Sequence, residues 1–249
     1  MCLTLTRVIV RISFMKNRAL QQRVYGGVKA DLRETERRKK LLTAGLEAFG
    51  TRGYAKTNIK TICVLAGLTE RYFYESFRNK EDLLSAVYQE LVDKQKSDTL
   101  KILDEAGNRP LDAASSAIRM FLYGFQENPL KAQTQLFEVM GVSPGIDRQY
   151  REAMRVLAEM VKLFLMKAFP GISDDAFRGN IIPTGLAGSI VLISHEWVLG
   201  GFVTPLDDII DKCMDLFIAV GRHIESKPRP GSAQKHRPVH RKLQHNQKR

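Results

Sequence analysis

Cysteine is scarce in this sequence, which has only Cys2, Cys63 and Cys213, an odd number spread far apart. No disulfide framework can be drawn from them, so a disulfide-stapled secreted scaffold is excluded and a reducing cytoplasm is favoured. Because buried thiols behave as small hydrophobic side chains, we expect Cys63 and Cys213 to lie in the core rather than to act as sensors.

Long apolar runs are also missing. No stretch of 18 apolar residues occurs, so no membrane-spanning helix is predicted. The first residues, MCLTLTRVIVRISF, lack a basic start and a small-residue cleavage site, which argues against a signal peptide. Their side chains alternate as in a strand, although Ile9 breaks the pattern. We expect residues 1–14 to be an unstructured extension, or sequence that precedes a true start at Met15.

Catalytic motifs are absent as well. The chain has no G-x-S-x-G, no H-E-x-x-H, no P-loop and no dinucleotide fingerprint. Three of the five histidines, His236, His240 and His245, stand in the basic C-terminal tail, where metal binding would be incidental. We therefore expect no enzyme, no cofactor and no metal site, with an enzyme on a helical scaffold as a remote alternative.

Acidic residues are missing from one end of the chain. Residues 226–249 hold eight Lys/Arg and no acid, and residues 1–40 hold eleven Lys/Arg against three acids, so each end carries +8. Since the net charge is +12, residues 41–225 carry −4. Basic ends commonly meet nucleic acid or anionic surfaces, or only keep a chain soluble. The tail is expected either to aid DNA binding without sequence preference or to have no function.

Strand patterns with hairpin turns are not found, whereas apolar residues recur at steps of three and four. The sequence therefore predicts an all-α fold. Thr57, Thr69 and Asn79 are expected N-caps, the last with Asp82 in the place of a capping-box acid. The expected helices cover about 34–50, 58–67, 70–77, 80–105, 111–127, a segment beginning at Pro129, 147–169, 183–200 and 206–224.

The stretch 57–77, TNIKTICVLAGLTERYFYESF, has the layout of a helix-turn-helix. Gly67 permits the turn between the two helices, because a Cβ would oppose that conformation. Phe73 and Phe77 are four residues apart and are expected to face inward. The second helix of such a motif enters the major groove with its other side, so the remaining side chains are expected to meet DNA.

From about Arg37 to Leu84 the chain resembles the N-terminal domain of the TetR family of transcriptional repressors. The resemblance rests on four features in one fixed order: a G-Y-x-x-T step, an A-G-L-T turn, an F-Y-x-x-F recognition helix and an N-K-E-x-L start of the fourth helix. The remaining two-thirds match by architecture, since the family has an all-helical ligand-binding and dimerisation domain there.

The resemblance implies a set of DNA contacts. Tyr74, Lys80 and Thr57 stand at positions that touch phosphates in the family. The positions that read bases are occupied by Lys60, Thr69, Glu70, Arg71, Tyr72 and Glu75. Glu70 and Glu75 depart from the family pattern, because a carboxylate near phosphate is repelled unless it accepts a bond from cytosine N4. Arg71 either pairs with guanine or neutralises Glu75.

The C-terminal part predicts an effector site and a subunit interface. Rings and thioethers suggest a ligand pocket, although such residues also build plain cores. The candidate effector residues are Phe121, Phe125, Phe137, Met140, Met160, Phe164 and His195. For His195 the alternatives are a ligand contact or buried polar switch on the one hand and a satisfied histidine near a subunit interface on the other. The last two helices, 183–201 and 206–224, are expected to form a four-helix dimer interface.

The expected organisation is a basic, disordered extension (1–33), a helix-turn-helix domain (34–82), an effector-binding and dimerisation domain (83–225) and a basic disordered tail (226–249). We predict a homodimeric transcriptional regulator, a repressor, that binds a palindromic operator on double-stranded DNA and is released by a small, largely apolar effector. The alternative is a constitutive architectural DNA-binding protein without an effector.

Overall fold

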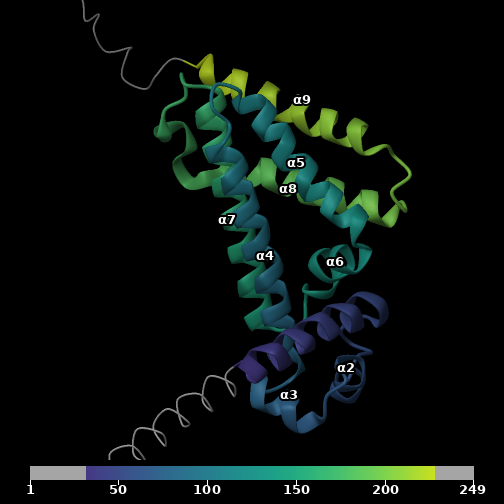
Figure 1. Cartoon of the computed structure of the whole chain (residues 1–249). Coiled ribbons are helices and arrows are strands. Elements are labelled where there is room, and N and C mark those ends of the chain that lie inside the picture. Colours follow the sequence, from purple (N-terminus) through teal and green to yellow (C-terminus); the bar gives the residue numbers. More distant parts are fainter. Residues whose placement is uncertain (1–31, 228–249) are drawn as a thin grey trace, which may run out of the picture.

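The computed structural model describes residues 32–227, and within this range every regular element is a helix (Figure 1). The predicted all-α fold is confirmed for this part of the chain. The extension over residues 1–14 and the tail from residue 228 onward lie outside the described residues, so the expectations for them stay predictions.

Three helices form the small N-terminal domain at the bottom of Figure 1. The first is helical from residue 32, where the description begins, to residue 52. It is followed by α2 (Ile59–Ala66) and α3 (Glu70–Ser76). Gly67 ends α2 at φ 64°, a left-handed conformation that glycine adopts without a Cβ penalty. The predicted helix-turn-helix is therefore present.

The N-cap of α2 is Asn58 and not Thr57, which corrects the sequence prediction by one residue. The Asn58 side chain accepts a hydrogen bond from the Thr61 amide at 2.8 Å. Thr57 is buried instead, and its hydroxyl donates to the carbonyl oxygens of Ala48 at 3.1 Å and Gly53 at 2.8 Å. The hydroxyl thus closes the loop between the first two helices rather than capping the second.

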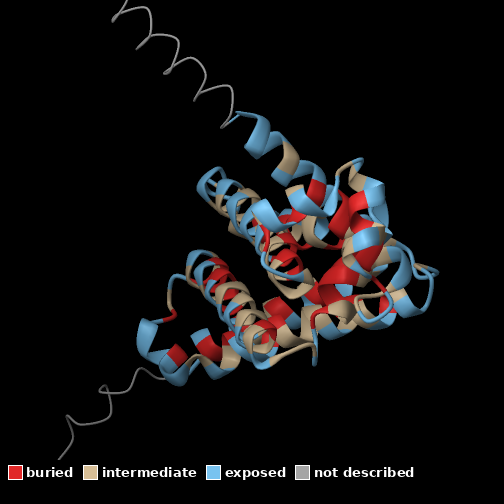
Figure 2. Cartoon of the chain, turned by 90° about the horizontal axis from the view of Figure 1, so that it is seen from below, coloured by how far each residue is buried: buried red, intermediate tan, exposed pale blue. Residues whose placement is uncertain are grey.

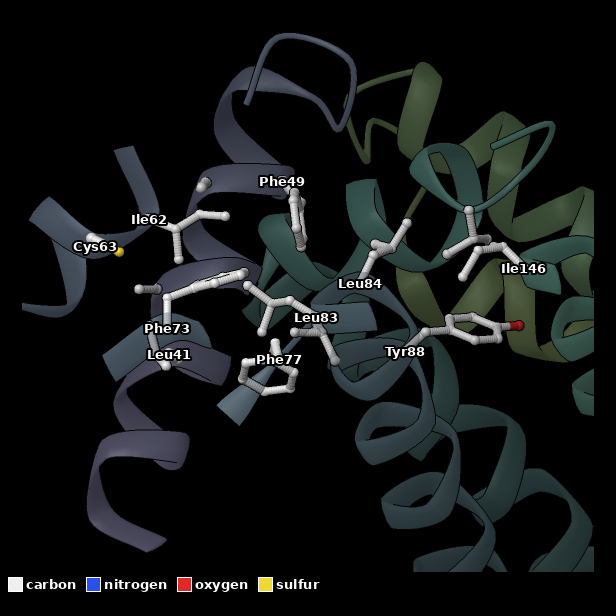
Figure 3. Close-up of a cluster of buried hydrophobic side chains, with 14 residues drawn as sticks. Leu41, Phe49, Ile62, Cys63, Phe73, Phe77, Leu83, Leu84, Tyr88 and Ile146 are labelled. Carbon is white, nitrogen blue, oxygen red and sulfur yellow. The ribbon is translucent and has the colours of Figure 1, made fainter. Parts of the chain in front are cut away.

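The two phenylalanines of α3 and its C-cap face inward, as predicted. Phe73 is fully buried and Phe77 is 3% exposed, and both belong to one buried cluster with Leu41 of the first helix and Ile62 of α2 (Figure 3). Full burial of one such ring contributes about 1.5–3 kcal/mol to stability. These contacts fix the rotation of α3 about its own axis and so decide which of its side chains face out.

The core of the N-terminal domain continues into the rest of the molecule. The long helix α4 (Lys80–Asp104) begins beside α3 and runs up the molecule next to α7 (Pro144–Ala168) (Figure 1). Tyr88 of α4 and Ile146 of α7 belong to the same buried cluster as Phe73 (Figure 3). The unbroken helix α4 and this shared cluster join the two parts of the molecule.

The C-terminal part packs its helices around three further buried clusters. In Figure 2 the buried segments lie on the helix faces that point towards one another. It consists of α5 (Pro110–Glu127), α6 (Pro129–Gln133), α7, α8 (Ile181–Leu199) and α9 (Leu206–Glu225). The predicted start of α7 at residue 147 is three residues late, because Ser143 caps the helix by accepting from the Ile146 amide at 3.2 Å.

Two short segments were not predicted. A π-helical turn, Thr134–Glu138, continues directly from α6, and a 3-10 segment, Asp174–Asn180, leads into α8. The sequence shows no sign of the π-helical turn, since one extra residue per turn leaves no periodic signal over five residues. Such turns are frequent at functional sites.

Cys63 and Cys213 are both buried, which confirms the prediction that they belong to the core. Burial raises the pKa of the Cys213 thiol to about 11, and burial with the nearby Glu70 raises the pKa of Cys63. Both thiols are therefore protonated near neutral pH, the form that does not react as a nucleophile.

Candidate DNA-binding surface and effector cavity

The first helix holds α3 in place with two neighbouring arginines. The guanidinium of Arg37 lies 4.5 Å from the centre of the Tyr72 ring and 3.6 Å from the Glu75 carboxylate. Arg38 stacks over the Phe77 ring at 4.3 Å and donates to the Ser76 carbonyl at 3.0 Å. Sequence reasoning missed both arginines, because the first helix carries several charges and only the packing shows which of them face α3.

The outer side of α3 is polar and accessible. Thr69, Glu70 and Arg71 are exposed, and Tyr74 is 56% exposed. Tyr72 is only partly accessible, because its ring lies under Arg37. The side chains that can meet a duplex are thus gathered at the N-terminal end and one face of the helix, where a recognition helix presents them.

Arg71 and Glu75 form an ion pair one helical turn apart, with Nε to Oε1 at 3.1 Å. Of the two roles considered for Arg71, the free protein shows neutralisation of Glu75. The Arg71 side chain is 84% exposed, and such surface pairs contribute only about 0–1 kcal/mol. Arg71 can therefore leave Glu75 and bind a base edge at little energetic cost. The Glu75 carboxylate would then still be paired with Arg37, which lies 3.6 Å away.

The N-terminal end of α2 is the second part of this surface. Lys60 is exposed in its first turn, which contains no acidic residue. Lys56, in the loop before α2, is exposed as well and was missed, although a lysine next to a helix start is a visible signal. Free backbone N–H groups and two cations make this end attractive to phosphate.

Lys80 and Thr57 are placed differently from the other candidates. The Lys80 ammonium donates to the carbonyl oxygens of Tyr54 at 2.7 Å and Thr57 at 2.8 Å, and it lies 4.1 Å from the Tyr54 ring centre. Burial lowers the pKa of Lys80. In the free protein Lys80 therefore ties α4 to the loop before α2, and Thr57 is buried inside that loop.

Two cavities of about 60 Å³ and about 50 Å³ lie among α4, α5 and α7 in the C-terminal part. Both are lined by Thr99, Phe121, Leu157 and Met160, so they are adjoining parts of one hollow. The first cavity also has polar lining, including Gln95 and Gln135, whereas the second is almost wholly apolar. An apolar cavity with a few convergent polar groups is the usual form of a small-molecule site.

Only some of the candidate effector residues line the two cavities. Phe121, Met160 and Phe164 line the cavities. The other candidates do not line these two cavities: Phe125 is fully buried against Phe121, Met140 is 51% exposed, and Phe137 stacks with His195 at 4.2 Å between ring centres. Arg119, on the same helix as Phe121, pairs with Asp207 on the surface.

Fold and surface together define a helix-turn-helix protein, with a small N-terminal domain on a larger helical domain. The family model for bacterial regulatory proteins of the tetR family matches residues 41–87. This range contains the motifs on which the resemblance was based, and the resemblance to the TetR family of transcriptional regulators is thereby confirmed. Proteins of this kind are generally not enzymes.

Several characterised proteins are similar to the chain. The transcriptional activator FasR of Mycolicibacterium smegmatis is 28% identical over 165 residues, which cover 66% of this chain and 73% of FasR. FadR of Bacillus subtilis in complex with stearoyl-CoA aligns with a TM-score of 0.63 at 16% identity, covering 73% of this chain and 97% of FadR. SmeT is the repressor of the multidrug efflux pump SmeDEF in Stenotrophomonas maltophilia. Its complex with triclosan aligns with a TM-score of 0.62 at 16% identity, covering 74% of this chain and 90% of SmeT. At these identities the solved structures show the fold alone.

Proposed function

We propose that this protein is a cytoplasmic repressor that binds a two-fold symmetric operator as a homodimer and is released by a small, largely apolar effector. In this proposal residues 34–82 bind DNA and residues 83–225 bind the effector and the second subunit. The observation that carries it is the orientation of α3, which buries Phe73 and exposes Arg71 and Tyr74 on its other side.

The proposed DNA contacts follow from this orientation. Tyr74 and the N-terminal end of α2 with Lys60 would touch phosphates, whereas Thr69, Glu70 and Arg71 would reach base edges. Tyr72 and Glu75 join the readout set once Arg37 and Arg71 shift towards the duplex. Lys80 and Thr57 would act by holding the loop before α2, with the third ammonium proton of Lys80 left for a phosphate.

The exposed side of α8 supports the homodimer. Its N-terminal two-thirds carries apolar or small residues at steps of three and four, which makes a stripe along that part of the helix. Ile181, Gly185, Gly188 and Leu192 make up this stripe. Leu199 is exposed seven residues further along, with the exposed carboxylate of Glu196 between it and Leu192. Leu192 is 62% exposed, and the space around Gly185 and Gly188 is open. An apolar face of this extent favours a partner, and two copies of α8 and α9 would form the four-helix interface.

The segment Asp174–Leu199, which contains α8, is also long and apolar enough to cross a membrane, and 22% of its most apolar part is buried. Length and composition are weak support for a span, because the interface helix of a soluble dimer satisfies the same test. The packing of α8 on α7 and α9 in a regulator fold supports the dimer instead.

Two connections would carry the effector signal to the DNA-binding domain. One is α4, which belongs to both parts. The other is Glu138 of the π-helical turn, whose carboxylate accepts from the Tyr54 amide at 2.6 Å and from Gln133 Nε2 at 2.7 Å. An effector that binds better to one arrangement of these elements would shift the population towards a dimer whose recognition helices no longer match the operator.

The similar proteins support an effector but differ in the sign of regulation. The SmeT and FadR structures hold triclosan and stearoyl-CoA, both with large apolar parts. SmeT is a repressor, whereas FasR is an activator. We favour repression, because release by a ligand is the simplest outcome of moving two recognition helices apart. Transcription in vitro from a promoter containing the selected operator measures the sign directly.

Selection of bound DNA from a random library by the purified full chain tests the proposal. The expected result is a palindrome whose half-sites are one helical turn or a multiple of it apart. Competition with random duplex at fixed salt separates this from the architectural alternative, whose affinity would hardly depend on sequence. Recovery of unrelated sequences with equal affinities would overturn the operator-binding proposal.

A further inference from the structure

Two glutamines from different elements meet at the polar end of the cavities. Gln135 of the π-helical turn donates from Nε2 to Oε1 of Gln95 on α4 at 2.7 Å. Both side chains line the first cavity, and Gln135 is only 8% exposed. The pair therefore belongs to the wall of the hollow, and it joins two elements that also contact the DNA-binding domain.

Each amide of this pair keeps one buried polar atom without a partner among the described residues. These atoms are Nε2 of Gln95, a donor, and Oε1 of Gln135, an acceptor. If the nitrogen and oxygen of both amides are exchanged, the pair still has one unpaired donor and one unpaired acceptor, so this property does not depend on the amide assignment. A buried polar group without a partner costs about 1–3 kcal/mol, which a suitable ligand group would recover.

The rest of the hollow sets the character of the ligand. The second cavity extends between Phe164 and Phe217 and has Thr99 as the one polar residue in its lining. Lys96, which is exposed, is the single charged residue in either lining. A carboxylate beside the glutamine pair would face the oxygen of Gln135 without a cation at that depth, and its desolvation would be unfavourable.

From this arrangement we infer that the effector is an uncharged amphiphile with one hydroxyl or carboxamide group. This group donates to the free acceptor of the Gln95–Gln135 pair and accepts from its free donor, while a hydrocarbon part fills the apolar cavity. The inference rests on the proposed effector function of the cavities. A site with one donor and one acceptor rejects analogues that lack either group, because its own buried atoms then stay unpaired.

Calorimetric titration of the full-length protein with three probes that share a ten-carbon chain tests this inference. Decan-1-ol both donates and accepts, 1-methoxydecane only accepts, and decanoate carries a charge. We expect decan-1-ol to bind about three- to tenfold more tightly than the ether, the range of one hydrogen bond, and decanoate to bind most weakly. The double variant Gln95→Leu/Gln135→Leu should bind the alcohol and the ether equally.

The double variant removes both amides, so no unpaired partner is left behind and the fold should persist, which a circular-dichroism melting curve checks. Gln89→Leu is the matched control, because Gln89 lies on α4 but does not line either cavity. Its amide bonds to Asp93 and Gln149 on the surface. This control should keep the preference for the alcohol.

The outcomes separate the inference from the proposed function. If all probes bind but the alcohol and the ether bind equally to the wild type, the amides are satisfied by water and the inference is wrong. Tightest binding of decanoate would also overturn it and would point to Lys96. If no probe binds, the inference fails together with the effector role of the cavities, whereas operator selection would still stand.

Discussion

Adjacent residues of α3 have opposite roles, although both are aromatic. Phe73 is fully buried in the domain core, whereas Tyr74 next to it is 56% exposed. The two rings are in edge contact, with centres 5.5 Å apart, so the buried ring also positions the exposed one. The difference between them is one hydroxyl, which suits a ring to water and to phosphate.

Replacement of Tyr74 by Ala is expected to weaken binding to all DNA sequences by about ten- to a hundredfold, because a hydrogen bond to a charged phosphate contributes about 1.5–3 kcal/mol. Tyr74→Phe keeps the ring and should show most of the same loss. Fluorescence anisotropy with operator and random duplex measures both affinities. Sedimentation should show unchanged dimers, and a monomeric variant would contradict the assignment to phosphate.

Replacement of Arg71 by Ala should instead relax the preference at particular base pairs, with about 1–3 kcal/mol of discrimination lost at each position that Arg71 reads. Selection from a random library with the variant measures this loss. Arg78→Ala is the control, because Arg78 is equally exposed and pairs with Asp82 in the same way one turn along. An unchanged preference of the Arg71 variant would remove Arg71 from the readout set.

At the scale of the element, α8 and the π-helical turn have the clearest expected roles. In the proposed dimer the exposed apolar face of α8 meets the second subunit. The π-helical turn contacts both the cavity and the loop before α2 through Gln135 and Glu138. In this proposal α8 forms the dimer interface, and the π-helical turn links effector binding in the cavity to the DNA-binding domain.

Leu192→Glu should break the dimer, because each buried leucine contributes about 1.5–3 kcal/mol and a charge would replace it at the centre of the interface. Analytical ultracentrifugation measures the subunit equilibrium, and operator affinity should fall with it. Met140→Glu places the same charge on an exposed apolar residue outside α8 and α9 and should leave the dimer intact. A dimeric Leu192 variant would exclude this face of α8 from the interface.

Glu138→Ala removes the acceptor of the Tyr54 amide and of Gln133. We expect the loss of operator affinity caused by effector to shrink by about 0.5–2 kcal/mol, the usual size of such coupling changes. Operator titrations with and without decan-1-ol measure this coupling. Glu127→Ala, which removes a surface carboxylate bonded to Tyr123, is the control. If the Glu138→Ala and Glu127→Ala variants show the same coupling between effector and operator binding, Glu138 does not carry the signal. Of the two proposed connections between the cavity and the DNA-binding domain, α4 alone would then remain.

For the whole molecule, the uneven charge is the main feature. Both ends are strongly basic, whereas residues 41–225 carry a net charge of −4, which follows from +12 for the chain and +8 for each end. A mildly acidic body gains little attraction to DNA, so long-range attraction would come from the ends.

Deletion of residues 226–249 is expected to reduce the salt dependence of DNA affinity. Each phosphate contact that is lost lowers the slope of log affinity against log salt by about 0.9. Titrations of operator and random duplex at several salt concentrations measure the slope, and both should change alike because the tail has no sequence preference. An unchanged slope would show that the tail does not touch phosphate.

The sequence by itself determined the helix ranges and the resemblance to the TetR family. Steps of three and four between apolar residues set the helix ranges to within a few residues, and Gly67 with the rings at positions 73 and 77 defined the helix-turn-helix. These signals are local, because caps, turns and helix faces depend on residues at most four positions apart.

Tertiary structure alone decided which polar side chains act together. Arg37 meets Tyr72 and Glu138 meets Tyr54 across long stretches of chain, and no local pattern records such pairs. Lys80 occupies the position expected of a phosphate contact, yet nearby carbonyl oxygens bind its ammonium. The meeting of Gln95 with Gln135 likewise depends on a π-helical turn without a periodic signature, because long-range packing and not local spacing brings their amides together.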